Sequence, residues 1–549
     1  MGEILYFCKL KNVTTVRESR ESEPRAPKIK GKRKNKDKEA MKIFTTKEIS
    51  EIDRYTIENE GVDGLELMDR AATGVVLEVM SRFRPNQRIV IFAGSGNNGG
   101  DALLVAAKLY EHGYRPEVIL FNVRSSQLSP ACEACRNQLL SMENVRFTEV
   151  VSTYAPPELS SSDVVIDGLF GTGLRTPINS GFATLIRYIS DSGAYVISID
   201  VPSGLCGEWN SGTPRYNIMR ANLTLAFQFE RLSFFFEENA DYIGEVKVID
   251  IDLSEEAQRK TCSDFYRIEA SDIRKVIKPR KPYCNKYAVG TLYMVAGSYG
   301  MMGAAVLAAR SAMRAGVGLL TVHAPMCGFN PLQCGVPEAL FETDENEYIT
   351  TNIDVRRKYS ALAIGPGLGT NDDTIAAVDS FLKKAVQPVV IDADALNCIA
   401  KRPILLKSIP RGSVLTPHAG EFDRLFGQHS TQEERLLKAI EVAKLYGFII
   451  VLKGHNTMTV RYDGKVYVNS SGNAGMATAG CGDVLTGVIA SLMAQGYTPD
   501  WAAVMGVYVH GLAGDMAAEE QGEMGLTASD IAANVGKAIK RIIDNKSGF

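Results

Sequence analysis

The sequence contains no long apolar run, and this absence sets the first limit on its class. No segment reaches 18 consecutive apolar residues, and a helix needs about that many to cross a bilayer. We therefore expect no membrane span. The amino-terminal apolar stretch, residues 4–8, is followed by Lys9 and is too short for the apolar core of a secretory signal. These two features predict a protein that stays in the cytoplasm.

Dense cysteine arrays are also missing, because the 10 cysteines are scattered over 549 residues. This usage suits a reducing compartment better than a disulfide framework. One Cys-x-x-Cys pair, Cys132 and Cys135, has no second pair of Cys or His nearby. A structural zinc site needs four spaced ligands. We therefore interpret this pair as structural thiols rather than as a zinc or redox site.

A strong net charge is the third missing feature. The chain carries −3 in total, but residues 1–40 hold 12 Lys and Arg against 6 Asp and Glu, which is +6 and leaves −9 for residues 41–549. A mildly acidic folded part argues against general nucleic-acid binding. Residues 1–40 hold too little apolar surface to offset their ordering entropy. We expect a disordered basic extension there, and a solvated tail is favoured over an address or a nucleic-acid contact.

What remains is an ordinary globular composition, with 45% apolar and 23% charged residues. The length suits two large α/β domains. Apolar strand-like runs alternate with helical patterns, which predicts an α/β class with two doubly wound, mostly parallel sheets. In the first half we expect strands at residues 88–93, 117–121, 163–166, 194–200, 221–227 and 245–251, with a helix at 100–111. In the second half we expect them at 291–296, 319–323, 360–364, 388–391, 413–416, 448–452 and 457–462. The predicted domains are residues 41–253 and 286–549, joined by a polar linker at 254–285 that holds the Pro- and Lys-rich stretch 278–282.

A glycine-rich turn follows the first of these strands and opens the first predicted helix. Residues 94–101 read Gly-Ser-Gly-Asn-Asn-Gly-Gly-Asp, and bare amides at a helix start favour an anion. The string also fits G-x-G-x-x-G, the fingerprint of a hydride-transferring Rossmann enzyme. Such an enzyme needs an acid at the end of the second strand. Here Glu117 lies at the beginning of that strand, so the dehydrogenase interpretation is not favoured.

Polar side chains follow two further strands of the first half at the points where the strands end. Asp167 and Asp200 end the strands at 163–166 and 194–200, and Ser203 follows in Val-Pro-Ser-Gly. Open α/β sheets place ligands at this edge. Oxygens of Asn98, Asp167 and Ser203 are therefore predicted to converge on an alkali or alkaline-earth cation. The alternative is that each residue merely caps a helix or satisfies a loop; the three together favour a site.

In the second half, Gly480, Cys481, Gly482 and Asp483 stand where an apolar helix begins. Amides at such a start hold a phosphoryl group, and the carboxylate is placed to accept a proton from the attacking hydroxyl. The alternative is a tight turn capped by Asp483. Further motifs lie upstream at residues 365–369, 391–397, 415–422 and 453–457. A lone histidine is usually structural, but the place of His418 in Pro-His-Ala-Gly-Glu favours a functional role.

Together these motifs resemble a known family, the bifunctional NAD(P)H-hydrate repair enzymes. The resemblance covers residues 41–253, as an NAD(P)HX epimerase domain, and residues 286–549, as a ribokinase-like dehydratase domain in which Ala304 and Ala305 after Gly303 complete the motif set. It implies epimerisation of the R and S forms of NADHX and NADPHX. It further implies dehydration of the S form at the expense of ADP or ATP with Mg2+. A homo-oligomer is also expected.

The resemblance assigns roles residue by residue. In the first half Asp200 would contact the substrate and be catalytic near the reacting carbon, and potassium (K+) would be held by Asn98, Asp167 and Ser203. The hydrated dinucleotide would contact Asn97, Asn98, Gly99, Gly100, Asp101, Gly171, Thr172, Gly173, Leu174, Arg175, Thr176 and Pro177. In the second half Ala305, Gly367, His418 and Asp483 would contact the hydrate, with Asp483 catalytic, and Lys453, Gly454, His455, Asn456, Thr457 and Gly482 would hold the nucleotide. Two positions depart from the family pattern: Ala102 stands where glycine is usual, and Cys481 where Thr or Ser is usual.

Chemistry explains why the two activities would share a chain. Hydration of the nicotinamide ring creates a stereocentre at C6, so damage yields both epimers and one stereospecific site repairs only one. Hydroxide is a poor leaving group, whereas phosphate on the C6 oxygen is expelled by the ring nitrogen's lone pair. Two alternatives stay open: a small-alcohol kinase of a vitamin precursor with a nucleotide-binding regulatory domain, and a binding scaffold of the kind found in RNA-processing assemblies. A scaffold has no need to retain Asp167, Asp200 and Asp483.

Overall fold

The computed structural model describes residues 40–123 and 128–544. All but the last residue of the predicted basic extension lies outside them. No helix in these two ranges is both long enough and apolar enough to cross a membrane.

The first half is built on a seven-stranded sheet in which every neighbouring pair is parallel, in the order β4-β3-β2-β5-β6-β7-β8. The strands are β2 (Ile89–Ala93), β3 (Glu117–Phe121), β4 (Arg146–Val150), β5 (Val164–Gly168), β6 (Tyr195–Ile199), β7 (Leu223–Phe227) and β8 (Glu245–Ile249). The order reverses between β2 and β5. In an open parallel sheet the carboxyl ends of strands at this switch point form the ligand crevice.

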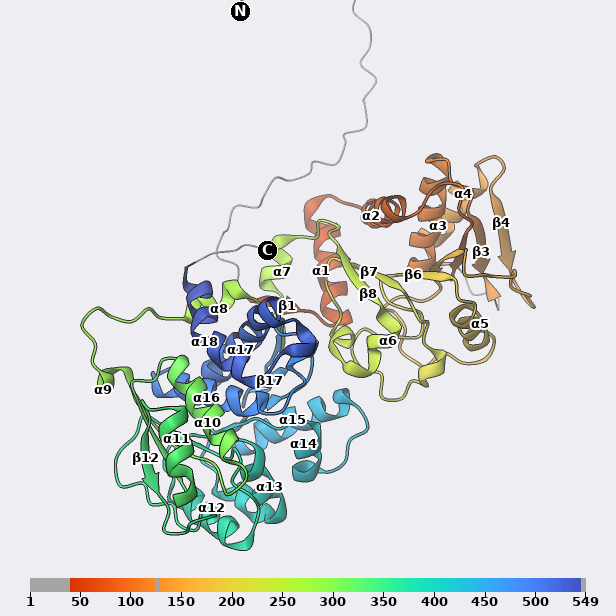
Figure 1. The fold of residues 1–549 in the computed structure, drawn as a ribbon. Coiled ribbons are helices and arrows are strands. Elements are labelled where there is room, and N and C mark those ends of the chain that lie inside the picture. The colour runs from red at the N-terminus through yellow and green to blue at the C-terminus, as the bar shows by residue number, and fades with distance from the viewer. Residues whose placement is uncertain (1–39, 124–127, 545–549) are drawn as a thin grey trace, which may run out of the picture. The chain divides into compact units, whose positions relative to one another are not determined.

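Both faces of this sheet are covered, as the apolar strands require. The helices are α1 (Thr46–Glu60), α2 (Gly64–Arg82), α3 (Asn97–Glu111), α4 (Pro130–Leu140), α5 (Ser180–Asp191) and α6 (Ala240–Ile243). Ile91 of β2 belongs to the apolar cluster under α2, α3 and α4, whereas Phe92 belongs to the cluster under α5. Figure 1 shows α3 and α4 together on one side of these strands and α5 on the other.

The second half is built on an eleven-stranded mixed sheet, in the order β1-β9-β18-β17-β16-β15-β14-β13-β10-β11-β12. Its strands are β1 (Met41–Ile43), β9 (Phe265–Ile268), β10 (Thr291–Val295), β11 (Leu319–Ala324), β12 (Leu340–Thr343), β13 (Ala361–Ile364), β14 (Val389–Ile391), β15 (Val414–Leu415), β16 (Ile449–Leu452), β17 (Met458–Val460) and β18 (Val466–Asn469). From β12 to β16 all pairs are parallel, and β17 is antiparallel to both its neighbours. The prediction of two doubly wound, mostly parallel α/β sheets is confirmed.

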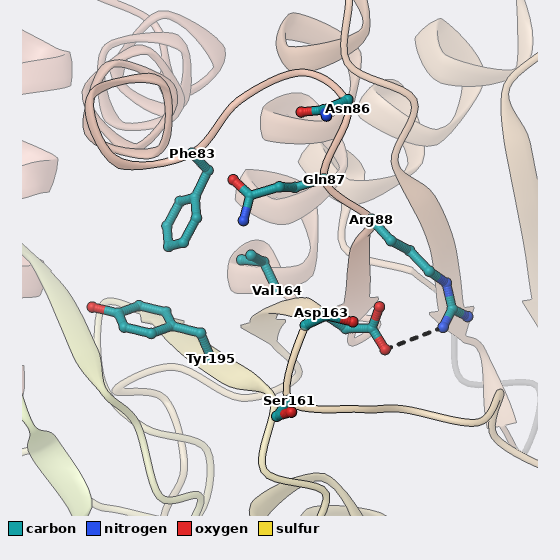
Figure 2. Close-up of a pocket in the computed structure, with 9 residues that line it drawn as sticks. Phe83, Asn86, Gln87, Arg88, Ser161, Asp163, Val164 and Tyr195 are labelled. Carbon is teal, nitrogen blue, oxygen red and sulfur yellow. Dashed lines mark hydrogen bonds and ion pairs between the residues drawn. The ribbon is translucent and has the colours of Figure 1, made fainter.

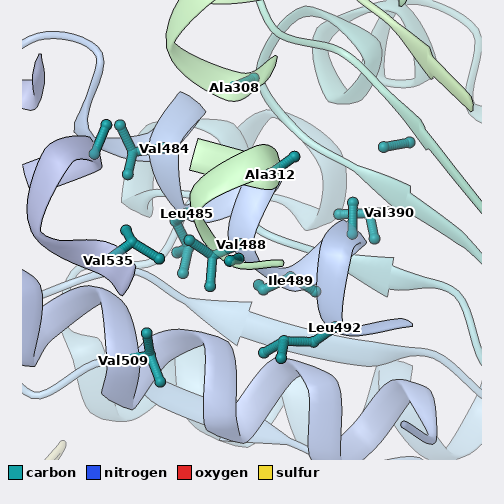
Figure 3. Close-up of a cluster of buried hydrophobic side chains, with 14 of the residues drawn as sticks. Ala308, Ala312, Val390, Val484, Leu485, Val488, Ile489, Leu492, Val509 and Val535 are labelled. Carbon is teal, nitrogen blue, oxygen red and sulfur yellow. The ribbon is translucent and has the colours of Figure 1, made fainter. Parts of the chain in front are cut away.

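Helices cover both faces of the large sheet as well. The helices of this half are α8 (Ala270–Val276), α9 (Lys286–Val289), α10 (Met302–Arg314), α11 (Phe329–Gly335), α12 (Asp372–Lys384), α13 (Ala393–Lys401), α14 (Ala419–Phe426), α15 (Gln432–Tyr446), α16 (Cys481–Ala494), α17 (Pro499–Gln521) and α18 (Ala528–Ile543). Helix α7 (Glu255–Lys260) packs against α1 instead. Helix α16 is nearly all apolar and lies between α10, α17 and the sheet. Figure 3 shows its Val488 among Ala312 of α10, Val509 of α17 and Val535 of α18. This burial fixes the start of α16 firmly.

Two strands join the large sheet from outside the predicted second domain. Strand β1 pairs antiparallel with β9, and β9 pairs parallel with β18, so that Phe265 lies opposite Val466. The expected linker 254–285 therefore contains α7, β9 and α8. The physical reason is that β18 would otherwise present an unpaired edge, which β9 and β1 extend. The domain boundaries themselves stay a prediction.

A surface hollow lies at the opposite end of the first sheet from the glycine-rich loops. It measures about 600 Å³ and is lined at the amino ends of β2, β5 and β6, where Phe83 and Tyr195 face it (Figure 2). Arg88 Nη1 and Asp163 Oδ2 form an ion pair of 3.4 Å beside it. Ligands of parallel sheets bind at the carboxyl ends, so we do not assign the active site to this hollow.

Candidate active sites

The first site begins where β2 turns into α3. Gly96 caps the helix without a side-chain hydrogen bond, which leaves the amides of the first turn available to an anion. The approach of backbone to backbone requires glycine. A Cβ at Gly99 would lie 1.7 Å from the Gly94 carbonyl oxygen, and one at Gly94 would lie 1.9 Å from that of Leu169. The turn is therefore held directly against the loop that follows β5.

Asp167 and Ser203 meet at the carboxyl ends of β5 and β6. Ser203 Oγ donates to Asp167 Oδ1 at 2.5 Å and its amide to Oδ2 at 2.9 Å, while Ser198 Oγ donates to Oδ2 at 2.8 Å. Both Asp167 and Ser203 have no exposed surface. Burial raises the pKa of Asp167, and these hydrogen bonds oppose that shift. The structure brings these two predicted cation ligands into direct contact.

Asn98, the third predicted cation ligand, lies against the second glycine-rich loop. A Cβ at Gly171 would be 3.1 Å from Asn98 Cβ, so this loop and the first turn of α3 touch. The Nδ2 atom of Asn98 is buried and has no hydrogen-bond partner within the described residues. Its carboxamide is thus left for a ligand. No direct hydrogen bond joins Asn98 to Asp167 or Ser203 among the described contacts.

Asp200 is held in an uncommon backbone conformation at the end of β6. Its φ is +67°, in the left-handed region that non-glycine residues rarely adopt. Oδ1 accepts from Arg231 Nη2 at 2.5 Å, and Oδ2 accepts from the Thr172 amide at 3.3 Å. The carboxylate is therefore fixed between a cation and the glycine-rich loop. Strain of this kind is concentrated at functional sites.

The rest of the second glycine-rich loop forms a partly exposed rim. Its members Gly173, Leu174, Arg175, Thr176 and Pro177 are exposed or half-buried. The loop is closed by a hydrogen bond from the Leu174 amide to the Gly171 carbonyl at 3.2 Å. The Thr172 amide joins this loop to Asp200; that residues 171–177 contact the dinucleotide stays a prediction.

Sequence analysis did not identify two charged residues near Asp200, namely Asp53 and Arg231. Asp53 of α1 is half-buried, and burial together with Asp200 raises its pKa to about 6, although Arg231 opposes the shift. Burial likewise raises the pKa of Asp101 well above its usual range, and the charges of Asp200 and Asp53 add to this. Asp53 and Arg231 lie outside every glycine-rich motif, so no local pattern marks them.

Cys132 and Cys135 lie on α4 beside this site and are both buried. Burial raises their pKa to about 12 and about 11, respectively. Cys132 Sγ is 3.6 Å from the Gly94 carbonyl oxygen, and Cys135 Sγ is 3.5 Å from Met68 Sδ. Apolar packing of this kind agrees with structural thiols.

The second site is organised around Lys453, which follows β16. Its Nζ atom is 2.9 Å from Asp392 Oδ1 and 3.7 Å from Glu421 Oε2. Asp392 follows β14 and also accepts from Thr486 Oγ1 of α16 at 2.6 Å. Burial alone would lower the pKa of Lys453, but the carboxylates of Asp392 and Glu421 outweigh it and raise the pKa. A charged lysine therefore stands at the carboxyl ends of these parallel strands.

Asp483 lies in the first turn of α16, above that lysine. Gly480 caps the helix with φ +87° and no side-chain hydrogen bond, so the amides at the helix start are available to a phosphoryl group. A Cβ at Gly482 would be 3.2 Å from Lys453 Nζ. Burial, then the charge of Asp392, raises the pKa of Asp483 to about 7, and Lys453 opposes the shift. A carboxylate with such a pKa is suited to exchange protons near neutral pH.

Cys481 contributes a thiol rather than the hydroxyl usual at its position. Its Sγ atom is 3.4 Å from His510 Nε2. Burial raises the pKa of Cys481 to about 11 and lowers that of His510 to about 4. The pair is therefore neutral near pH 7, and the side chain of Cys481 packs against His510 while its amide remains at the helix start.

His418 acts as the cap of α14. Its Nδ1 accepts from the amides of Gly420 and Glu421 at 3.0 and 3.3 Å, and Glu421 Oε2 accepts from the His418 amide at 2.9 Å. The ring is half exposed at 53%. A structural role is therefore plain, and the exposed edge of the ring leaves room for the predicted ligand contact.

The remaining predicted residues of the second site fall into two places. Ala305 is buried on α10. Gly367 is also buried, and its φ is +63°. It approaches the turn before α10, because a Cβ on Gly367 would lie 2.6 Å from the Met301 carbonyl oxygen. Any ligand would meet this turn through backbone. In the loop after Lys453, Gly454 and His455 are exposed while Asn456 and Thr457 are half-buried, and Thr457 Oγ1 closes the loop by donating to the Gly454 carbonyl at 2.9 Å.

Comparison with known proteins adds sequence relationships to this geometry. A family model described as NAD(P)H-hydrate dehydratase matches residues 292–537, and one described as YjeF-related protein N-terminus matches residues 64–233. The chain is 34% identical to the bifunctional NAD(P)H-hydrate repair enzyme Nnr of Thermofilum pendens, covering 91% of this chain and 97% of that protein. It is 33% identical to the enzyme of the same name from Moorella thermoacetica, over 89% and 95%. Among solved structures, the ADP/ATP-dependent NAD(P)H-hydrate dehydratase from Bacillus subtilis, co-crystallised with ATP/Mg2+, is 32% identical with a TM-score of 0.45, covering 50% of this chain and 97% of that one.

Proposed function

The chain belongs to the family of bifunctional NAD(P)H-hydrate repair enzymes, and from this premise we propose how its two sites divide the work. The site at the carboxyl ends of β2, β5 and β6 epimerises the R and S hydrates of NADH and NADPH. The site between β14, β16 and the start of α16 dehydrates the S hydrate with ADP or ATP. The relatives span both halves, which favours repair over the small-alcohol kinase alternative, since that alternative accounts for only one half.

One observation carries the dehydratase assignment: Asp483 and Lys453 share the uncapped start of α16. Asp483 takes the proton from the C6 hydroxyl as its oxygen attacks the terminal phosphoryl group of the nucleotide. The amides of residues 482 and 483 and the Lys453 ammonium stabilise the charge that develops on the phosphoryl oxygens. The C6 oxygen then carries phosphate, and the ring nitrogen's lone pair expels it, which restores the C5–C6 double bond when C5 loses a proton.

The nucleotide is expected to bring Mg2+, which would neutralise phosphate charge when bound. Among the described residues no group of three or more His, Cys, Asp or Glu side chains is placed to hold a metal. This fits Mg2+, because that ion is commonly bound by one or two carboxylates together with substrate phosphates and water. Residues 453–457 and Gly482 are the proposed nucleotide contacts. His418, Ala305 and Gly367 are proposed to face the hydrate.

In the epimerase half, potassium is proposed at Asp167, Ser203 and Asn98. The donor set suits it, because the carboxylate of Asp167, the hydroxyl of Ser203 and the carboxamide oxygen of Asn98 are hard oxygens, and Asp167 and Ser203 lie in direct contact. Potassium would supply a fixed positive charge there. Asp200, fixed by Arg231 and Thr172, is proposed to exchange a proton with the substrate near C6. Residues 97–101 and 171–177 would bind the dinucleotide. A cytoplasmic location and a homo-oligomeric state stay predictions.

The direct test uses the full chain with a mixture of both NADPH-hydrate epimers, supplied in turn with ADP, with ATP or with no nucleotide. Recovery of the reduced-nicotinamide absorbance to completion with one nucleotide, and none without it, is the expected result. Accumulation of a phosphorylated product with no recovered absorbance would instead identify a kinase.

A further inference from the structure

Arg231 is a buried cation whose hydrogen-bonding capacity is only partly used. It follows β7 and is 2% exposed. Its Nη2 atom donates to Asp200 Oδ1 at 2.5 Å and to the Phe227 carbonyl at 3.3 Å. Its Nε and Nη1 atoms are buried and have no hydrogen-bond partner within residues 40–123 and 128–544. Buried polar groups are normally paired, so these two nitrogens call for an acceptor.

The surroundings of Arg231 show what kind of acceptor is missing. The guanidinium carries a fixed fork of five N–H donors and no acceptor, so only an oxygen-rich ligand satisfies it. Asp200, to which it is bound, is also held by the Thr172 amide of the dinucleotide-binding loop. Asn98, whose side chain lies against that loop at Gly171, has a second buried donor, Nδ2, without a partner among the described residues. Two unpaired donors, one beside this loop and one bound to Asp200, point to oxygens of a bound molecule.

We propose that Arg231 is a substrate-binding residue of the epimerase site, which fixes Asp200 with one nitrogen and offers its two unpaired nitrogens to an oxygen of the hydrated nicotinamide ring. This inference rests on the proposed function. Charge-assisted hydrogen bonds from a guanidinium are strong and directional, so they would hold the C6 oxygen or the carboxamide oxygen in register with Asp200. Asp53, which interacts electrostatically with both Arg231 and Asp200, would then share the same pocket.

The test measures interconversion of the R and S hydrates by the full chain without ADP or ATP, so that only the first half turns over. Arg231→Gln keeps much of the side-chain volume but removes the charge and the fork. We expect its KM for the R hydrate to rise about tenfold or more. Arg231→Lys keeps a charged donor, so its KM for the R hydrate should lie between that of Arg231→Gln and that of the wild type. Arg82→Gln is the matched control, because Arg82 pairs with Glu78 and Glu245 far from the loops, and its KM should be unchanged.

Dehydration of the S hydrate and the melting temperature, measured on the same variants, report folding. If Arg231→Gln melts lower, the comparison rests on Arg231→Lys. A KM at the wild-type value in the folded variants overturns the inference, whether or not kcat falls, since a lower kcat alone would make Arg231 a positioning residue for Asp200. A wild-type chain that fails to interconvert the epimers would instead defeat the proposed function itself.

Discussion

At the scale of single residues, we propose that dehydration depends on Asp483. Asp483→Asn keeps the size of the side chain, but the amide has no ionised form that could accept the hydroxyl proton. We expect kcat to fall by about 10² or more, as the loss of a positioned base does, while nucleotide binding is largely kept. Steady-state kinetics with the S hydrate checks the first part, and nucleotide titration checks the second. Near-normal turnover would remove Asp483 as the base.

The raised pKa of Asp483 also predicts a pH profile. Its pKa is about 7, because burial and the nearby charge of Asp392 disfavour the carboxylate. A proton acceptor works in its ionised form, so kcat should fall about tenfold per pH unit below about pH 7 and level off above it. The melting temperature, measured at each pH, controls for pH effects on the fold of the whole chain. A kcat that is flat from pH 5 to 8 would show that another group accepts the proton.

We propose that potassium dependence rests on Asp167. Asp167→Ala removes the buried carboxylate that Ser203 and Ser198 hold. We expect weaker epimerisation and loss of its stimulation by potassium, with dehydration of the S hydrate intact. Ser198→Ala serves as a control, because it removes a hydrogen bond to Asp167 and no proposed ligand. Equal loss of both activities in Asp167→Ala would point to misfolding or to a misplaced cation site.

At the scale of elements, the turn between β2 and α3 depends on close backbone contact. Gly99→Ala would place a Cβ 1.7 Å from the Gly94 carbonyl oxygen, so the first turn of α3 must move away from the end of β2. We expect a loss of about 1–3 kcal/mol in unfolding free energy, as overpacking typically causes, together with loss of epimerisation. Denaturant unfolding and the epimer assay measure the two effects.

Gly64→Ala is the control for that substitution. Gly64 begins α2 and a Cβ there meets nothing within 4 Å, so alanine should be neutral or stabilising by up to about 1 kcal/mol. Unchanged stability and activity in Gly99→Ala would show that the turn tolerates a side chain, and that its glycines are not required for the approach.

The elements also show where sequence patterns succeed. Strands were predicted at 88–93 and 117–121 because short apolar runs fit buried parallel strands, and β2 and β3 occupy 89–93 and 117–121. Strand β4 was missed because it is an exposed edge strand, with polar residues Arg146 and Glu149. Strands β1 and β9 were missed because they are short and because β9 pairs with β18 and β1 with β9, pairings between distant segments that no local pattern records.

At the scale of the whole molecule, the ordered motifs predicted both sites better than any single residue did. Asp167 with Ser203, and Lys453 with the start of α16, come together because consecutive parallel strands deliver their ends to one edge. Arg231 and Asp53 could not be predicted, since one follows β7 by four residues and the other lies on α1, and neither has a motif. His418 was assigned a ligand contact from its motif, and its role as the cap of α14 appeared only in the structure.

The central claim is that two stereochemically distinct sites on one chain act in sequence. The most direct measurement is the progress curve of Asp200→Asn with mixed hydrate epimers and the active nucleotide, followed by reduced-nicotinamide absorbance. The S hydrate should be consumed at the wild-type rate, because Asp483 and Lys453 are untouched, so a fast phase should stop at the S fraction. The R hydrate should follow only in a slow tail, at its uncatalysed epimerisation rate. A single fast phase running to completion would contradict the account and leave Asp200 as a structural residue at the end of β6.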